Sequence, residues 1–393
     1  MIDSSPEQKY GISDPDFDKT NLLWRAEAPR GSQRFRVLAG IRDTGEANAI
    51  TPVLNELSKQ SFDVFILATG RGEEALGSFK PRFTTSKYFN PRLRVERMRG
   101  NIAITGLSAT SSIEMALHDN AHQRGMKVFA IEDYPGSYCS YFEDTFAQNE
   151  GLKPDYLFVM NDWAKKTNLE QSSILPADRI IALGAPALDA IAHTDKSKTR
   201  DEVRNLLGVK PEETLILWCG QVAGATVESL DVFLKGLNIL KPEPYRLAVR
   251  FHPMDTTPKE TYDHLLESFK DKYINAGRAV VSEANRVIAA SDLVVQERST
   301  VAMQSAAWGV PVISIAIDEI NEKYGVMLGL KVPVIEDGTS PVITRKEDMA
   351  EVLEKVLFNQ EFRSQLDTKM QAWKSDGRAA ERVAHKIIEL TSN

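Results

Sequence analysis

A short stretch in the second half of the chain has the residue types of an anion-binding site. Arg298, Ser299 and Thr300 follow the apolar run 292–296 and precede a segment, 301–308, with helical character. A polar loop before a helix offers backbone N–H groups and the positive end of the helix dipole to an anion. Gln304 lies one turn into that helix, where it could reach sugar hydroxyl groups. The pattern predicts a phosphate-binding loop with a sugar contact at Gln304.

Two other loops of the second half are suited to the same anion. Gly220 and Gln221 belong to a glycine-containing loop, 218–226, that precedes a helix and can pass close to a diphosphate. Arg250 and His252 come at the end of an apolar run. A lone histidine usually has a structural role, but an arginine beside it favours an anion contact. We therefore expect all four residues near the predicted phosphate.

The first half offers carboxylates instead. Glu132 and Asp133 end the apolar run 126–131, where they are candidates for a general base or for an acceptor of a substrate hydroxyl. An exposed acidic pair at a turn explains them about equally well. Gly45, just before a helix, allows close backbone approach to a ligand, although a tight turn is the commoner reason for such a glycine. The spacing around Gly45 is not GxGxxG, so we do not predict a dinucleotide fold.

Composition excludes several classes of function. The net charge of −7 and the pI near 5.6 argue against a nucleic-acid-binding protein. Cys139 and Cys219 lack metal-ligand partners at motif spacing, so free thiols are expected and no metal site is predicted. No apolar run reaches membrane-spanning length, and the first residues do not resemble a secretory signal. These features lead us to expect a cytoplasmic protein.

The chemistry-bearing loops must be positioned by two series of buried strands. Apolar runs without polar alternation, separated by helical segments, predict parallel sheets covered on both faces, and so an α/β fold. At 393 residues the chain is long enough for about two domains. We predict an N-terminal arm (1–33), a first Rossmann-like domain (34–193), a charged linker (194–211), a second Rossmann-like domain (212–360) and C-terminal helices (361–393). Ligands of such sheets bind beyond the carboxyl ends of the strands, and two such domains facing each other form a cleft.

Several ordered motifs between residues 34 and 393 resemble the glycosyltransferase-B (GT-B) superfamily. The run ADRIIALGAPALDAI is similar to the segment that ends the family's first domain, with a Gly-x-Pro-x-x-Asp turn. Arg250-Phe251-His252-Pro253 looks like the His-Pro element of UDP-N-acetylglucosamine 2-epimerases and CDP-glycerol-type polymer transferases. RSTVAMQSAAWGVPVI resembles the nucleotide-sugar-binding helix, and GRAAERVAHKII the last helix, which often packs back onto the first domain.

The resemblance implies a glycosyltransferase of cell-envelope or surface polysaccharide synthesis. Its nucleotide-sugar donor, with UDP-sugars favoured, would be held by the second domain, and a glycan or lipid-linked acceptor by the first. Catalysis would need no bound metal or cofactor, because backbone amides and basic side chains stabilise the leaving diphosphate. Domain closure would exclude water. The implied roles are catalysis for Glu132, Asp133 and His252, and donor binding for a set drawn from the loops above: Gly45, Gly220, Gln221, Arg250, Arg298, Ser299, Thr300 and Gln304.

Two departures from the family pattern keep alternatives open. Gln304 occupies the position where many members have a ribose-binding glutamate, and its amide makes a weaker hydrogen bond than a carboxylate. Leu107 replaces an aspartate of the epimerases, so an epimerase or related hydrolase ranks below a transferase. An inactive relative that serves as a binding protein is the third reading. The arm containing Trp24 is a candidate contact for a homodimer.

Overall fold

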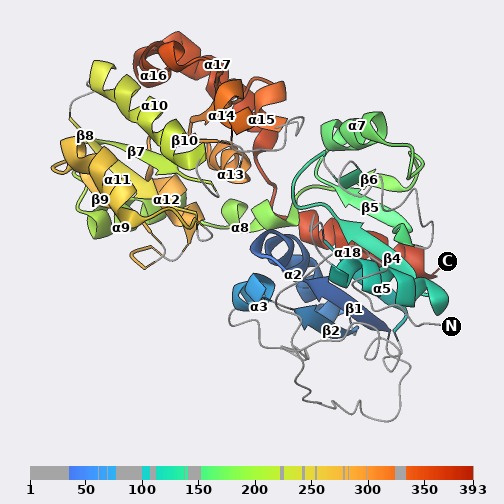
Figure 1. The fold of residues 1–393 in the computed structure, drawn as a ribbon. Coiled ribbons are helices and arrows are strands. Elements are labelled where there is room, and N and C mark those ends of the chain that lie inside the picture. Colours follow the sequence, from blue (N-terminus) through green and yellow to red (C-terminus); the bar gives the residue numbers. More distant parts are fainter. Residues whose placement is uncertain are drawn as a thin grey trace. The chain divides into compact units, whose positions relative to one another are not determined.

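The computed structural model describes residues 35–60, 62–68, 70–76, 100–106, 112–136, 138–139, 152–221, 225–240, 244–252, 255–277, 279–281, 283–297, 299–323 and 333–392. The predicted arm with Trp24, Leu107 and Arg298 lie outside these described residues. The chain divides into two compact units, with boundaries after Asp189 and after Ser375. The first unit contains the early strands and the last helix, and the second unit contains the intervening residues (Figure 1).

Six parallel strands form the sheet of the first unit, in the order β2-β1-β3-β4-β5-β6. Their bounds are β1 Arg36–Ile41, β2 Asp63–Ala68, β3 Ile102–Thr105, β4 Lys127–Ile131, β5 Tyr156–Val159 and β6 Ile180–Ala182. Val37, Ala39 and Ile41 join one buried cluster, whereas Leu38 joins another. Successive residues of a strand face opposite sides of a sheet, so both faces of this sheet are buried.

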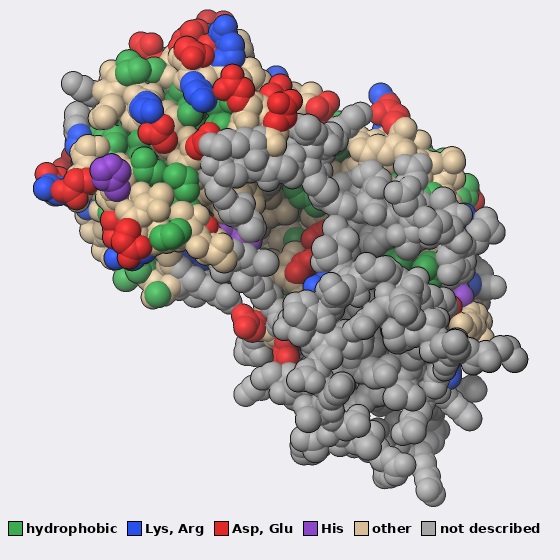
Figure 2. All heavy atoms as spheres, viewed as in Figure 1, with side chains coloured by type: hydrophobic (Ala, Val, Ile, Leu, Met, Phe, Trp, Pro, Cys, Tyr) green, Lys and Arg blue, Asp and Glu red, His purple; other side chains and the backbone are tan. Residues whose placement is uncertain are grey.

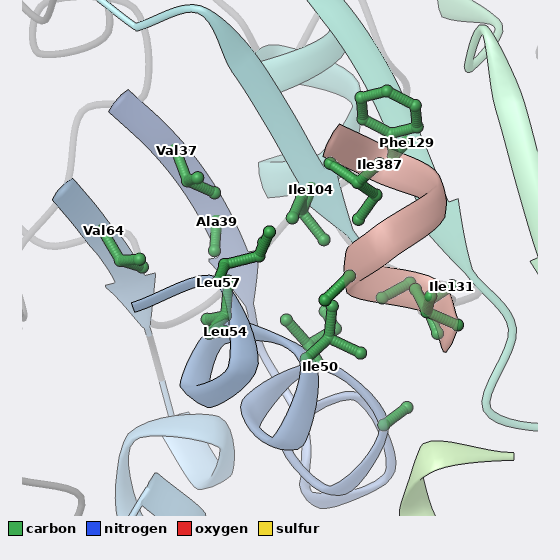
Figure 3. Close-up of a cluster of buried hydrophobic side chains, with 14 of the residues drawn as sticks. Val37, Ala39, Ile50, Leu54, Leu57, Val64, Ile104, Phe129, Ile131 and Ile387 are labelled. Atoms are coloured by element: carbon green, nitrogen blue, oxygen red, sulfur yellow. The ribbon is translucent and has the colours of Figure 1, made fainter. Parts of the chain in front are cut away.

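The helices of the first unit cover both faces of that sheet. Their bounds are α2 Thr44–Lys59, α3 Gly70–Leu76, α5 Ser112–Gln123, α7 Asp162–Gln171, the 3₁₀ turn η2 Pro186–Leu188 and α18 Ala379–Ser392. Ile50 and Leu54 of α2 pack with Ile387 of α18 in one buried cluster (Figure 3). Leu117 of α5 packs with Leu38 on the other face. The last helix of the chain is therefore part of the core of the first unit.

The Gly-x-Pro-x-x-Asp motif predicted to end the first domain fastens this last helix. The carboxylate of Asp189 accepts hydrogen bonds from the backbone N–H groups of Ala379 (3.1 Å) and Ala380 (2.8 Å) at the start of α18. Gly184 has φ of +102°, and a Cβ on it would lie 2.7 Å from the Cβ of Ala379. The glycine is thus required for both backbone conformation and close packing, and the aspartate satisfies amides that a helix start leaves unpaired.

The second unit repeats the architecture with its own sheet, in the order β12-β11-β10-β7-β8-β9, again parallel. Its strands are β7 Thr214–Cys219, β8 Tyr245–Arg250, β9 Tyr273–Asn275, β10 Leu293–Gln296, β11 Val312–Ile315 and β12 Val342–Ile343. Strand β12 has two residues and was not predicted. The rings of Trp218 on β7 and Phe233 are stacked with centroids 5.6 Å apart. This stacking anchors the helix that carries Phe233 to the sheet.

The helices of the second unit are α8 Asp189–Ala192, which spans the boundary, α9 Lys196–Leu207, α10 Ala225–Leu240, α11 Lys259–Leu266, α12 Ala284–Ala290, α13 Val301–Trp308, α14 Asp318–Lys323, α15 Pro333–Glu336, α16 Met349–Phe358 and α17 Gln360–Met370, with 3₁₀ turns η3 Glu267–Phe269, η4 Lys346–Asp348 and η5 Gln371–Trp373. Acidic and basic side chains lie side by side over α16 and α17 (Figure 2). Lys355 and Glu351, for example, form an exposed ion pair of 2.5 Å on α16. Such pairs contribute little to stability.

The stretch predicted as a linker, 194–211, contains helix α9 of the second unit. Its basic residues are engaged within that unit: Arg200 contacts Asp292 at 2.6 Å, and Arg204 contacts the same carboxylate at 3.2 Å. The boundary between the units falls earlier, after Asp189. Of the predicted C-terminal helices (361–393), α17 lies in the second unit and α18 in the first. These charged residues resembled a linker in the sequence because the residue that binds them, Asp292, lies far along the chain.

Candidate functional site

The strand orders define one topological switch point in each unit. In the first sheet the chain runs outward from β1 to β2 and then returns to place β3 on the other side of β1. In the second sheet it runs outward from β7 through β9 and then returns to place β10 beside β7. Loops at the carboxyl ends of such neighbouring strands diverge and leave a crevice, where open α/β sheets bind ligands. The structure therefore offers two candidate sites.

A buried hydrogen-bond network shapes the loop after β10. Gln296, at the end of that strand, accepts a hydrogen bond from the Ser299 N–H through Oε1 (2.8 Å) and donates from Nε2 to Ser314 Oγ (2.6 Å). Ser314 Oγ is in turn 2.8 Å from Ser340 Oγ. Since all these partners except Ser299 are buried, the network fixes the loop without using solvent. The sequence reasoning did not identify Gln296.

The predicted free amides of this loop are partly used within the protein. The Ser299 N–H bonds to Gln296, and the Val301 N–H donates to Ser299 Oγ (3.3 Å). Within the described residues, the Thr300 N–H has no hydrogen-bond partner, so of these three amides it is the one left for a ligand. Gln304 is half-buried in the second turn of α13. Of the backbone amides predicted to bind an anion, the candidate that remains is therefore that of Thr300, which precedes the eight-residue helix α13.

The loop after β7 meets this site through Thr226. Gln221 donates its N–H to Thr226 Oγ1 (2.7 Å), and a Cβ on Gly220 would lie 2.9 Å from the Thr226 methyl group. That position would also be 3.7 Å from Trp218 Nε1. Trp218 is fully buried, and Nε1 has no hydrogen-bond partner in the described part of the chain. Gly220 is needed for this close packing. The N–H group of the Trp218 indole, a potential hydrogen-bond donor, therefore lies near the switch point.

Glu297 is the acidic residue of this site, and the sequence reasoning missed it. It directly follows β10, is 7% exposed, and receives a 3.0 Å hydrogen bond from Thr226 Oγ1. Burial raises its pKa to about 7, the hydrogen bond from Thr226 opposes this shift, and the charge of Asp255 adds to it. Because this pKa is about 7, the ionisation of Glu297 changes in the physiological pH range. The sequence rule that selected Glu132, an acid at the end of a buried strand, applies equally to Glu297.

Arg250 and His252 end the neighbouring strand β8. Arg250 Nη1 donates to the carbonyl groups of Ala276 (3.0 Å) and Val281 (2.7 Å), and its own carbonyl accepts from the Gly220 N–H (3.0 Å). The guanidinium therefore braces the connection after β9. His252 is partly exposed, and its carbonyl accepts from the Asp255 N–H (2.9 Å). Donor contacts of both side chains stay predictions.

At the first switch point, Gly45 and Asp133 are packed against each other. A Cβ on Gly45 would lie 2.2 Å from Asp133 Oδ2, so any other residue would displace the carboxylate. Gly45 stands in the first turn of α2, whose N-cap residue Asp43 accepts from the Glu46 N–H (2.9 Å). Glu46 completes a capping box by accepting from the Asp43 N–H (3.4 Å). The glycine thus has a packing reason in the first unit, and its donor contact stays a prediction.

A cluster of carboxyl groups surrounds this turn. Burial, followed by the negative charges of Asp43 and Glu132, raises the pKa of Asp133 well above its usual range. Burial and the negative charge of the nearby Glu114 do the same to the pKa of Glu46. The first unit therefore gathers carboxyl groups whose pKa values are raised by burial and by one another's charge.

Glu132 differs from Asp133 in its surroundings. Its Oε1 accepts hydrogen bonds from Asn168 Nδ2 (2.8 Å) and from the Tyr138 N–H (3.1 Å), and the side chain is 5% exposed. The side-chain amide oxygen of Asn168, Oδ1, in turn accepts a hydrogen bond from the Cys139 N–H (2.8 Å). Glu132 therefore holds the segment after β4 in place. Asp133 is more exposed, and its Oδ1 has no partner within the described residues, which makes it the better candidate for a base.

The predicted site residues fall into two groups. Gly45, Glu132 and Asp133 belong to the first unit, while Gly220, Gln221, Arg250, His252, Ser299, Thr300 and Gln304 belong to the second. A cavity of about 450 Å³ in the second unit lies at the other end of α13, beside Trp308 and Lys196, and so is separate from the loop at Thr300.

Among the described residues, no group of three or more His, Cys, Asp and Glu side chains is arranged to hold a metal ion. None of the helices that the structure describes has the length and apolar character needed to cross a membrane.

The two parallel sheets with helices on both faces define a GT-B-like fold. Similar solved structures include S. aureus MnaA with UDP (TM-score 0.68, 16% identity, 90% of this chain and 96% of that chain) and the UDP-GlcNAc 2-epimerase of Neisseria meningitidis bound to UDP-GlcNAc (TM-score 0.65, 15% identity, 90% and 100%). The wall teichoic acid polymerase TagF is also similar (TM-score 0.59, 13% identity, 91% and 89%). At these identities the likeness concerns the fold and confirms the predicted two-domain α/β class.

The family comes from the sequence. Residues 126–389 match the family CDP-glycerol:poly(glycerophosphate) glycerophosphotransferase, and the chain belongs to this family. The matched residues include the second switch point and the end of β4 at the first. A search of curated proteins gave no significant match. Membership places the chain among transferases, which confirms the ranking of a transferase over an epimerase at the level of class.

Proposed function

We propose that this protein transfers a phosphoalcohol group from a CDP-linked donor, of the CDP-glycerol type, to a hydroxyl group of a growing cell-envelope polymer. The family match over residues 126–389 carries the proposal. The second unit supplies the donor site at the ends of β7 and β10, where Thr226 bonds to the buried Glu297 and Thr300 precedes α13. The acceptor lies with the first unit, as the resemblance to GT-B enzymes implies.

In this reaction the acceptor oxygen forms a bond to the distal phosphorus of the donor, and the bond from that phosphorus to the bridging oxygen breaks. CMP leaves with the bridging oxygen, and the hydroxyl proton passes to a base. Asp133 and His252 are the proposed bases, Asp133 because its Oδ1 has no hydrogen-bond partner within the described residues. The Thr300 N–H and the dipole of α13 stabilise charge on the leaving phosphate.

A UDP-sugar donor is the second candidate, and a specific observation favours it. Two of the similar structures contain UDP or UDP-GlcNAc. Attack at the anomeric carbon of a sugar would release UDP, with Glu132 or Asp133 as base. Gln304 at the position of the usual ribose-binding glutamate weighs against a donor site of the ordinary sugar-transferase type.

The released nucleotide separates these candidates. The protein is incubated with CDP-glycerol, UDP-N-acetylglucosamine or UDP-glucose and a polymer acceptor, and nucleotides are resolved by ion-exchange chromatography. Release of CMP that depends on acceptor supports phosphoalcohol transfer, and release of UDP supports sugar transfer. Exchange of the sugar C2 proton in deuterium oxide without acceptor would indicate an epimerase. A protein that neither binds nor turns over any of these donors is not a transferase of this kind.

A further inference from the structure

The cavity at the C-terminal end of α13, beside Trp308 and Lys196, belongs to neither switch point. We propose that this cavity, called here the α13 cavity, binds a phosphodiester unit of the polyol phosphate polymer that the proposed reaction extends. The inference rests on the proposed function for the source of the phosphodiester, because the growing polymer carries such groups. It adds a second polymer site, separate from the place where the acceptor hydroxyl reacts.

The α13 cavity has an apolar floor and a polar rim. Its volume of about 450 Å³ falls within the roughly 300–1,000 Å³ that is common for small-molecule sites. Ile191, Trp308 and Met370 are each at most 7% exposed and form the floor, which can pack against the carbon atoms of a ligand. An open rim lets a polymer continue beyond the cavity. The rim consists of exposed polar residues: Thr194, Asp367, Gln371 and Lys374.

Lys196 places a fixed positive charge in the α13 cavity. Its ammonium group donates to the carbonyl groups of Trp308 (2.6 Å) and Gly309 (3.3 Å) at the end of α13. An ammonium group has three N–H donors, and among the residues that the structure describes the third has no partner. The two carbonyl groups hold the ammonium in place without cancelling its charge. An anion in the cavity would supply the missing partner.

Lys374 adds a second positive charge on the rim. Its ammonium group forms no ion pair or hydrogen bond within the described part of the chain. Burial, and then the charges of Arg200 and Lys374, lower the pKa of Lys196, so the two lysines lie within electrostatic range of each other. Asp367 is the acidic residue of the lining, which therefore carries two positive charges and one negative. A phosphodiester, with its single negative charge, matches this excess of one.

A hydrogen-bonding group for a polyol accompanies the two lysines. Gln371 donates from Nε2 to the carbonyl group of Asp367 (3.2 Å), and its side-chain oxygen has no partner among the described residues. That oxygen can accept from a ligand hydroxyl while the ammonium groups bind the phosphate. Inorganic phosphate would use the lysines alone. The lining therefore favours a phosphate that is joined to a polyol.

Hydrogen exchange of the full chain tests the inference, with a synthetic glycerol phosphate trimer joined by phosphodiesters as the probe. We expect slowed exchange in peptides covering residues 191–196 and 367–375. The trimer concentration that gives half of the slowing in the 191–196 peptides measures the affinity of the cavity alone. Lys374→Gln should weaken this affinity about 1.5–5-fold, the effect of one exposed ion pair. Asp367→Asn should strengthen it, because a charge of the same sign as the phosphate is removed.

Two controls separate the α13 cavity from the rest of the second unit. Lys259→Gln removes an exposed lysine of α11 outside the cavity and should leave the trimer affinity unchanged. The affinity for CDP-glycerol should be unchanged in Lys374→Gln and Asp367→Asn, because Thr300 lies at the opposite end of α13. Lys196→Gln should weaken trimer binding about tenfold or more. Since Lys196 also binds the end of α13, the two exposed variants decide the matter if this variant does not fold.

The outcomes distinguish this inference from the proposed function. Release of CMP from CDP-glycerol without slowing by the trimer at residues 191–196 overturns the polymer site and leaves the proposed function intact. Slowing there that neither Lys374→Gln nor Asp367→Asn alters also overturns it. An equal or higher affinity for glycerol 3-phosphate or inorganic phosphate assigns the cavity to a small phosphate instead of a polymer. Trimer binding at the cavity without any CMP release overturns the proposed function and keeps the phosphodiester site.

Discussion

The topological switch points of the two units lie on similar parallel sheets but carry different functional groups. At the ends of β1 and β4, carboxyl groups such as Asp133 and Glu46 crowd around the start of α2. At the ends of β7 and β10, hydroxyl and amide groups lie around the buried Glu297. The parallel sheet determines where the loops come together, and the side chains of those loops determine the chemistry of the site. We therefore propose that the acid-rich end transfers a proton and that the hydroxyl-rich end binds the nucleotide.

The largest expected effect comes from removing the proposed base. Asp133→Asn should lower kcat by about 10²–10⁴-fold, the usual contribution of general-base catalysis, and leave the Kd for CDP unchanged. Steady-state kinetics and nucleotide titration measure the two quantities. Asp178→Asn, an exposed carboxylate of the same unit, is the matched control. A weakened Kd with an unchanged kcat would reverse the assignment of the two ends.

The second prediction concerns the core that supports the acid-rich end. Ile387 of α18 is fully buried between α2 and the sheet, so Ile387→Ala should reduce the free energy of unfolding by about 2–5 kcal/mol (Figure 3). Ile239→Ala makes the same change at a side chain that is 75% exposed and should cost little. Denaturant unfolding compares the variants. Equal stability of the two would show that α18 is not part of the core.

The third prediction tests the nucleotide end. Thr300→Val removes a hydroxyl group at the start of α13, and should weaken CDP binding by about 1.5–3 kcal/mol if that hydroxyl bonds to a charged phosphate. Saturating kcat should change less. Thr368→Val, exposed on α17, serves as control in isothermal titration. Unchanged affinity in Thr300→Val would show that the hydroxyl group does not bind the phosphate, because the variant keeps the backbone N–H.

The smallest effect is a pH dependence of stability in the first unit. Glu46 has a pKa raised by burial and by Glu114, so its folded form holds a proton that the unfolded chain releases above the ordinary value of 4.5. Its stabilising contribution is present below that value and is lost as the pH rises towards the folded pKa. Melting temperatures measured from pH 5 to pH 8 should therefore fall, and Glu46→Gln should flatten the slope. A slope identical in the variant would assign the effect to other groups.

Much of the scaffold follows from local sequence patterns. The apolar runs predict the main strands, and α13 begins and ends at the predicted residues, because a glycine with φ of +62° stops it at Gly309. The short edge strand β12 carries too weak a pattern to be predicted. The charged residues of α9 suggested a linker because nothing local shows that Arg200 and Arg204 both bind Asp292. Helices held by distant partners are the part that a sequence alone conceals.

The candidate site shows the same division. Acidic, glycine and hydroxyl residues at strand ends could be selected from the sequence, whereas the effect of Glu114 on the pKa of Glu46 depends on how α2 and α5 are placed on the sheet. The network through Gln296, Ser314 and Ser340 likewise joins residues of three separate segments. It reveals that the Ser299 amide, expected to bind phosphate, is already used. Glu297 could have been found by the strand-end rule that selected Glu132.

Hydrogen exchange of the full chain with and without CDP tests the central assignment most directly. We predict that the strongest slowing of amide exchange occurs in peptides that cover Gly220 to Thr226 and Glu297 to Gln304, at the ends of β7 and β10. The strongest slowing in peptides covering Asp43 to Glu46 and Glu132 to Gly136 would place the nucleotide at the acid-rich end and contradict the account.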